Sequence, residues 1–214
     1  AASPQDARPK DFVFQEASAS QLFARGFLGA LAAGANWVQV VSWNDYSESS
    51  HVAPSLRTSV AYGWLSAYYA EWFRAGTAPS IQSAALLYFH RTHFSYSIPD
   101  LSSQTKTWRI SPIDDVPEDI VEAVTFSPVG GQLRIRTQSG ARGFDIEPGI
   151  NVSRVPLDVG PICFELVLVD RQVLSDCSPH SVSNDIQFQD YQYVAGVIAA
   201  DRGSDVPRFF VRRP

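Results

Sequence analysis

The stretch Trp37-Val38-Gln39-Val40-Val41-Ser42-Trp43 decides the fold that this sequence predicts. It is short, rich in β-branched residues and mostly apolar on both faces, which is typical of a strand covered on both sides. Before it, apolar residues recur at helical spacing over residues 18–33, and Gly34 follows where helices commonly end. After it, a polar loop runs from residue 44 to about residue 59. We therefore expect a helix, a buried strand and a loop in this order.

A second helix and a second buried strand continue the pattern. Apolar and aromatic residues at positions 60, 64, 68 and 72 mark a helix that ends at Gly76, and residues 84–89 form another apolar run. This order is the repeat of an α/β protein. Two strands do not complete a sheet, and the 214 residues contain no methionine. We therefore expect this chain to be the C-terminal part of a longer protein whose other strands lie upstream.

From about residue 106 the apolar pattern changes to a period of two, as in half-buried strands. Strands are expected at residues 106–110, 121–126, 132–137, 162–169 and 173–177. Turn residues such as Glu147-Pro148-Gly149 separate these runs. The pattern predicts an antiparallel β-sandwich over residues 105–214, following an α/β part over residues 1–100.

The composition excludes several classes of protein. A net charge of -5 argues against a nucleic-acid binder, which needs a basic face. A hydrophobic fraction of 45% is ordinary for a globular protein and argues against disorder. No apolar run reaches the roughly 18 residues of a membrane span. The first residues show no signal peptide, so any such peptide would lie upstream.

Two features bear on the compartment. Cys163 and Cys177 are too far apart for a CxxC motif, and spacing alone leaves a disulfide and two buried free thiols equally open. A hairpin that turns at Asp170-Arg171 would place the two cysteines on opposing strands. Asn151, in the triplet Asn-Val-Ser, is a possible glycosylation site, although such triplets are common by chance. Together these features favour an oxidising compartment.

The segment after the first predicted strand carries the chemistry. Asp45 and Glu48 lie three residues apart at the carboxyl end of that strand, where barrel enzymes place their active sites. Paired carboxylates suit glycoside hydrolysis, in which one protonated group donates to the leaving oxygen and one ionised group acts as base or nucleophile. The structural alternative is that Asp45 caps a turn or helix and Glu48 completes a capping box. The pattern alone favours this alternative.

A resemblance changes that balance. The segment Trp43-Asn44-Asp45-Tyr46-Ser47-Glu48-Ser49 resembles the W-N-D-Y-G-E-S segment of the family 71 glycoside hydrolases, the fungal α-1,3-glucanases or mutanases. Residues 22–27 and the strand end at residues 88–93, similar to the family's Y-W-Y-R-P-H, continue the likeness in the right order. Ser47 replaces the usual Gly, His51 comes one place later than the family's His, and Thr92 replaces a Pro.

The resemblance implies a fold and an activity. The fold is a (β/α)8 barrel followed by a β-sandwich, with the last barrel units over residues 1–100. The activity is endo-acting, inverting hydrolysis of α-1,3-glucan by a secreted protein that needs no cofactor and is monomeric when full-length. The family's catalytic pair maps to Asp45 and Glu48, and which is acid and which is base stays open. A third acidic residue of the family lies on an earlier strand outside this chain, so we expect the 214 residues alone to be inactive.

Other side chains are candidates for binding the substrate. They are polar or aromatic and follow one of the two predicted barrel strands: Trp43, Asn44, Tyr46, His51, His90, Arg91 and His93. Each also has a structural alternative. A lone His is usually structural, Trp43 can pack in a core, and Arg91 can pair with Asp45 or Glu48 and keep its partner ionised.

Three further expectations follow. The acidic residues Asp114, Asp115, Glu118, Asp119 and Glu122 lack the spacing of a calcium loop, so we expect a solvated face and no metal site. The basic residues Arg208, Arg212 and Arg213 are expected to form a solvated chain end. The alternative function is a non-catalytic carbohydrate-binding module built on the β-sandwich; a hydrolase for another α-linked glucan is a third possibility.

Overall fold

The computed structural model describes residues 2–111, 116–199 and 209–210, the last two by their backbone only. Its centre is a four-stranded antiparallel sheet, the middle sheet. The order is β12 (Val194–Ala199), β4 (Ala85–His90), β6 (Ile120–Ser127) and β9 (Gly149–Pro156). This sheet carries apolar side chains on both faces, as β4 illustrates: Leu86 and Tyr88 lie in one core, Leu87 and Phe89 in another.

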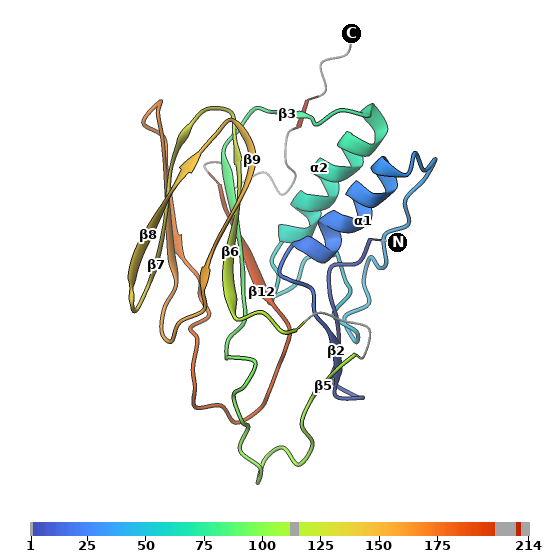
Figure 1. The fold of residues 1–214 in the computed structure, drawn as a ribbon, viewed down its shortest axis with the longest axis vertical. Helices are drawn as coiled ribbons and strands as arrows, with labels where there is room; N and C mark the ends of the chain where they lie inside the picture. Colours follow the sequence, from blue (N-terminus) through green and yellow to red (C-terminus); the bar gives the residue numbers. More distant parts are fainter. Residues whose placement is uncertain (1, 112–115, 200–208, 211–214) are drawn as a thin grey trace.

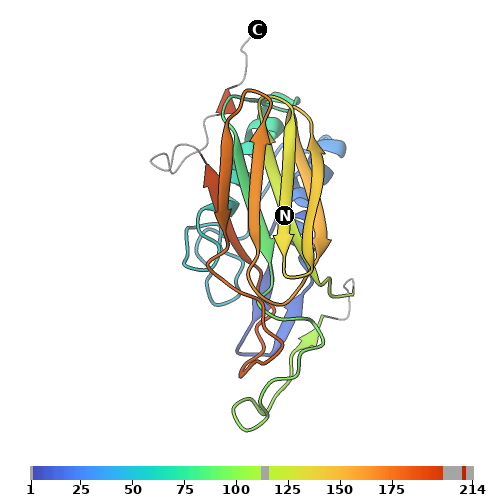
Figure 2. The same ribbon diagram turned by 90° about the vertical axis from the view of Figure 1, so that its left-hand side faces the viewer.

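A second four-stranded antiparallel sheet, the outer sheet, covers one face of the middle sheet. Its order is β11 (Val173–Cys177), β10 (Cys163–Leu168), β7 (Gly131–Thr137) and β8 (Gly140–Ile146). Its strands alternate in the way a half-buried sheet requires, since Leu133 and Ile135 are buried and Arg134 between them is exposed. The two sheets form a β-sandwich, with the outer sheet toward the viewer in Figure 2.

Two helices, α1 (Gln21–Ala32) and α2 (Ala61–Ala75), cover the other face of the middle sheet (Figure 1). Their aromatic side chains, among them Phe23, Tyr62 and Tyr68, pack in one core with Phe89 and Phe126 of the sheet. Both helices end where the sequence predicts, because Gly34 and Gly76 adopt the left-handed conformation that a helix terminus favours. The molecule is thus a helical layer on a two-sheet sandwich.

Two small sheets complete the structure. One contains β1 (Asp6–Arg8), β2 (Val13–Gln15) and β5 (Arg109–Ile110), with β2 and β5 parallel. The other pairs β13 (Phe209–Phe210) with β3 (Ser80–Ile81). No helix among the described residues is long and apolar enough to cross a membrane.

Two expectations about strands require correction. Residues 37–43 make only an isolated parallel bridge, between Val40 and Ala2, and not a buried strand. The apolar run at 84–89 is a strand buried on both faces, but it pairs antiparallel with β12 and β6 inside the sandwich. An apolar run indicates only that a strand is buried on both faces. A helical layer on one face and a second sheet on the other bury a strand as fully as a barrel does.

Two buried carboxylates, each paired with an Arg, fasten the segment before α1 to the middle sheet. Glu16 accepts a hydrogen bond from the Ser18 backbone N–H (2.7 Å) and from Arg91, which follows β4 (2.9 Å). Glu122 on β6 accepts from the Ser20 N–H (3.0 Å) and pairs with Arg154 of β9. The helical layer is therefore joined to the sandwich by charge as well as by apolar packing.

The acidic stretch differs from the expected solvated face, because Glu122 is fully buried against Arg154 and Asp119 accepts two hydrogen bonds from Ser95. Asp114 and Asp115 lie outside the described residues, as does the basic group Arg208, Arg212 and Arg213. Within the described part of the chain, no three His, Cys, Asp or Glu side chains are grouped to hold a metal ion.

Candidate active site

The acidic segment folds as a tight turn built around Asp45. Its Oδ1 accepts hydrogen bonds from the Ser47 hydroxyl (2.7 Å), the Ser47 N–H (3.1 Å) and the Glu48 N–H (3.2 Å). The Asp45 N–H in turn donates to the Ser42 hydroxyl (3.0 Å). These bonds, led by that from the Ser47 hydroxyl, hold the pKa of the Asp45 carboxyl below its usual value. The turn thus has the capping geometry of the structural alternative, and the same geometry keeps a carboxylate ionised.

Strand β1 holds this turn in place. The Ala7 N–H donates to the Glu48 carbonyl (2.9 Å), and the Ser49 hydroxyl donates to the Ala7 carbonyl (3.1 Å). The next residue, Arg8, donates to both carboxylate oxygens of Asp6 (2.8 and 2.6 Å), which leaves its Nε 3.9 Å from Glu48 Oε1. Glu48 therefore has a cation nearby that is already engaged by another carboxylate.

Exposed aromatic rings flank the turn. Trp43, two residues before Asp45, is 66% exposed, and Tyr46, directly after Asp45, is 51% exposed. Asn44 is exposed beside them. The structure therefore does not place Trp43 in a core, and these flat rings are available to a ligand that lies across the turn.

His51 lies beneath the turn, buried against the ring of Tyr46 (centroids 4.4 Å apart). Its Nε2 is 3.4 Å from the Thr58 hydroxyl. Burial lowers the pKa of the His51 ring, and the neighbouring Asp45 partly offsets this. His51 thus supports Tyr46 and does not face solvent.

The other three predicted binding residues do not join this turn. His90 hydrogen-bonds Ser178 and the Arg91 carbonyl, both at 2.8 Å, and His93 accepts from the Asp190 N–H (2.7 Å). Arg91 pairs with Glu16 and not with Asp45 or Glu48, and its guanidinium lies 4.2 Å from the ring centre of Tyr193. All three are buried and none of these described residues contacts the acidic pair, so their role in substrate binding stays a prediction.

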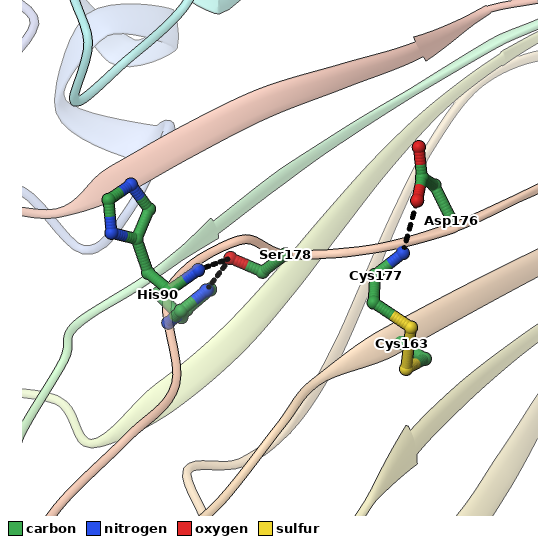
Figure 3. The surroundings of a disulfide bond; sticks show 6 residues. His90, Cys163, Asp176, Cys177 and Ser178 are labelled. Atoms are coloured by element: carbon green, nitrogen blue, oxygen red, sulfur yellow. Dashed lines mark hydrogen bonds between the residues drawn. A yellow bond between two sulfur atoms is a disulfide. The ribbon is translucent and has the colours of Figure 1, made fainter.

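The pair Cys163 and Cys177 faces across β10 and β11, and a disulfide joins the two residues. Figure 3 shows it near Ser178, the hydrogen-bond partner of His90. Asn151 lies partly exposed at the start of β9, where its side chain bonds the Glu147 backbone across the turn. Whether it carries a glycan stays a prediction.

His90 makes stability depend on pH. Burial lowers its pKa to about 4 from a usual value of 6.5, so the folded state excludes a proton that the unfolded chain binds below pH 6.5. Stability is therefore full above that pH and is lost as the pH falls from about 6.5 toward 4, by roughly 3 kcal/mol. Denaturant unfolding at several pH values should show this slope, and His90→Gln should flatten it. An unchanged slope in the variant would exclude His90 as its source.

Paired carboxyl groups are what most glycoside hydrolases use to cleave sugar chains. The family model of Glycosyl hydrolase family 71 matches residues 9–207. The chain therefore belongs to glycoside hydrolase family 71. Comparisons with curated proteins and with solved structures give no match.

Sequence reasoning missed Asp6 and Arg8. They lie about forty residues before the turn in sequence, and only the pairing of β1 with the Glu48–Ser49 backbone brings them together. The charged residues at positions 6–11 gave no signal of that contact, because charged side chains are common on any protein surface.

Proposed function

We propose that this protein hydrolyses internal α-1,3-glucosidic bonds of α-glucan with inversion of configuration. Membership of family 71 supports glycoside hydrolysis, and the turn that carries Asp45 and Glu48 is the observation on which the proposal rests. The flanking rings of Trp43 and Tyr46 are exposed, so they are free to pack on sugar rings.

The geometry favours Asp45 as the general base, which leaves the role of general acid to Glu48. Three hydrogen bonds from its own turn keep Asp45 ionised, as a base that activates water must be. Arg8 forms a longer ion pair with Glu48 (3.9 Å) and donates its hydrogen bonds to Asp6. The mechanism needs two carboxyl groups, so we assign the remaining role, that of the general acid, to Glu48.

The products test the linkage and the stereochemistry. On oligosaccharides of defined linkage, we expect an active, longer form of the protein to cut α-1,3 bonds and to leave α-1,4 bonds intact. Proton NMR during the first minutes should show the β-anomer, because inversion of an α-bond gives a β-product. An α-anomer would contradict inversion. Cleavage of α-1,4 bonds alone would contradict the proposal that α-1,3-glucan is the substrate.

We further propose that the 214 residues on their own do not turn over glucan and that the protein is secreted. The Glu48 side chain is 45% exposed, whereas an efficient acid needs a site that excludes water. The disulfide and the acceptor Asn151 support an oxidising, extracellular compartment. A longer form carrying the proposed barrel should be active where this chain is not, and equal activity of the two forms would refute the first proposal.

A further inference from the structure

A cavity of about 310 Å³ opens beside the β1–β2 hairpin, outside the acidic turn. Its walls include three aromatic rings, those of Phe12, Trp108 and Phe188. The volume is within the range of small-ligand sites. All eight lining residues lie in the described part of the chain, and none carries a charged side chain. The cavity therefore suits a neutral ligand and gives a phosphate or carboxylate no partner.

The rings give the cavity an apolar face that is open to solvent. Phe188 is 56% exposed, and Phe12 meets Trp108 edge to face with ring centres 5.8 Å apart. A pyranose ring presents C–H groups on its faces and hydroxyls around its rim. It can therefore pack on such rings while its rim reaches the exposed hydroxyl side chains of Ser103 and Thr105 in the same wall.

Hydrogen bonds fix the shape of this wall before any ligand arrives. The Gln189 N–H donates to Gln104 Oε1 (2.8 Å), and the Trp108 indole N–H donates to the Gln189 carbonyl (3.0 Å). The Gln189 side chain also donates to the Ser97 carbonyl (2.8 Å). A wall held in this way loses little conformational entropy on binding.

The cavity is joined to the acidic turn by β1. Ala7 bonds the backbone of Glu48 and Ser49, and Pro9, two residues further along the chain, lines the cavity. Two residues of extended chain span roughly 7 Å. A sugar chain cut at the turn would therefore reach the cavity within a few units.

We propose that this cavity is an accessory subsite that binds another segment of the α-1,3-glucan chain held at Asp45 and Glu48. The inference rests on the proposed function for the identity of the ligand. The occupant is the same neutral polysaccharide, because the cavity follows β1 from the turn and offers aromatic faces and hydroxyl groups but no charge.

Two variants remove a ring with little risk to the fold. Phe188→Ala truncates an exposed side chain, and Phe12→Gly replaces a residue at φ 52° with one that adopts this conformation freely. The matched control is Tyr96→Ala, an aromatic residue that is 69% exposed and does not line the cavity. Thermal unfolding of each variant should match that of the unaltered chain.

Calorimetric titration of the 214-residue chain with α-1,3-linked glucose oligosaccharides tests the proposal. We expect Phe188→Ala and Phe12→Gly each to weaken binding by about tenfold, and Tyr96→Ala to leave it unchanged. Absence of binding by the unaltered chain, equal binding of β-1,3-linked oligosaccharides, or unchanged affinity in both cavity variants would overturn the proposal.

The outcome is separable from that of the proposed function. The rate of hydrolysis by Asp45→Asn tests the proposed function, whereas the affinity of Phe188→Ala tests the subsite, because Phe188 lines the cavity and Asp45 does not. Suppose that Asp45 and Glu48 proved dispensable for hydrolysis while Phe188→Ala still weakened binding. The assignment of the acidic pair as catalytic would then be refuted, and the proposed subsite would be supported.

Discussion

Replacing Asp45 by Asn, or Glu48 by Gln, is expected to lower kcat on α-1,3-glucan by about 10²- to 10⁴-fold. Both changes keep the size of the side chain and remove its ability to ionise. In Asp45→Asn the side-chain carbonyl oxygen can still accept the hydrogen bonds of the turn, so the fold should persist. The measurement is the initial rate of reducing-end release by an active form of the protein, with circular dichroism to verify folding. Near-normal rates in both variants would refute the assignment.

A change of substrate separates the two roles. A glycosyl fluoride leaves without a proton, so the variant that lacks the acid should recover much of its rate on it, whereas the variant that lacks the base should not. We expect recovery in Glu48→Gln and none in Asp45→Asn. Recovery in the opposite variant would exchange the roles of the two residues and keep the pair.

Replacing Arg91 by Met is expected to lower the free energy of unfolding by about 3–5 kcal/mol. Arg91 and Glu16 pair at 2.9 Å with side chains only 1% and 0% exposed, so the change leaves a buried carboxylate without its cation. The variant also loses the bonds from Arg91 to the carbonyls of Tyr191 and Glu118. Urea denaturation followed by tryptophan fluorescence measures the loss.

Arg134→Met is the matched control. Arg134 pairs with Glu165 at 3.5 Å on the outer sheet, where the two side chains are 64% and 43% exposed. An ion pair of this kind contributes at most about 1 kcal/mol, because water and salt screen it. If both Arg variants lost the same free energy of unfolding, burial of the Arg91–Glu16 pair would contribute nothing extra to stability.

The sequence predicts local structure well where the signal is local. Both helices and their glycine ends follow from apolar spacing and from Gly34 and Gly76. The turn at Asp170-Arg171 places the two cysteines opposite each other in the observed register. Strand β8 escaped prediction because its first residues are exposed and polar or small, so no alternating apolar pattern marks it.

Long-range pairing is what the sequence did not reveal. The apolar run of β4 predicts burial but not the partner strands, and β12, more than 100 residues later, completes its pairing. The same limit applies to the site. Local spacing found the acidic turn, whereas the burial of Arg91 against Glu16 depends on a contact across 75 residues.

The position of β4 has a consequence for how this chain can be divided. A cut at residues 100–105 would separate β4 from β6 and β12, its neighbours on both sides in the middle sheet. A cut after α2 would instead remove the helices from an apolar sheet face. Deletion of residues 105–214 is therefore no test of a carbohydrate-binding role, because neither piece would keep a finished sheet. In chimeras between family members, we therefore expect the helices and the sandwich to fold only when both come from the same parent.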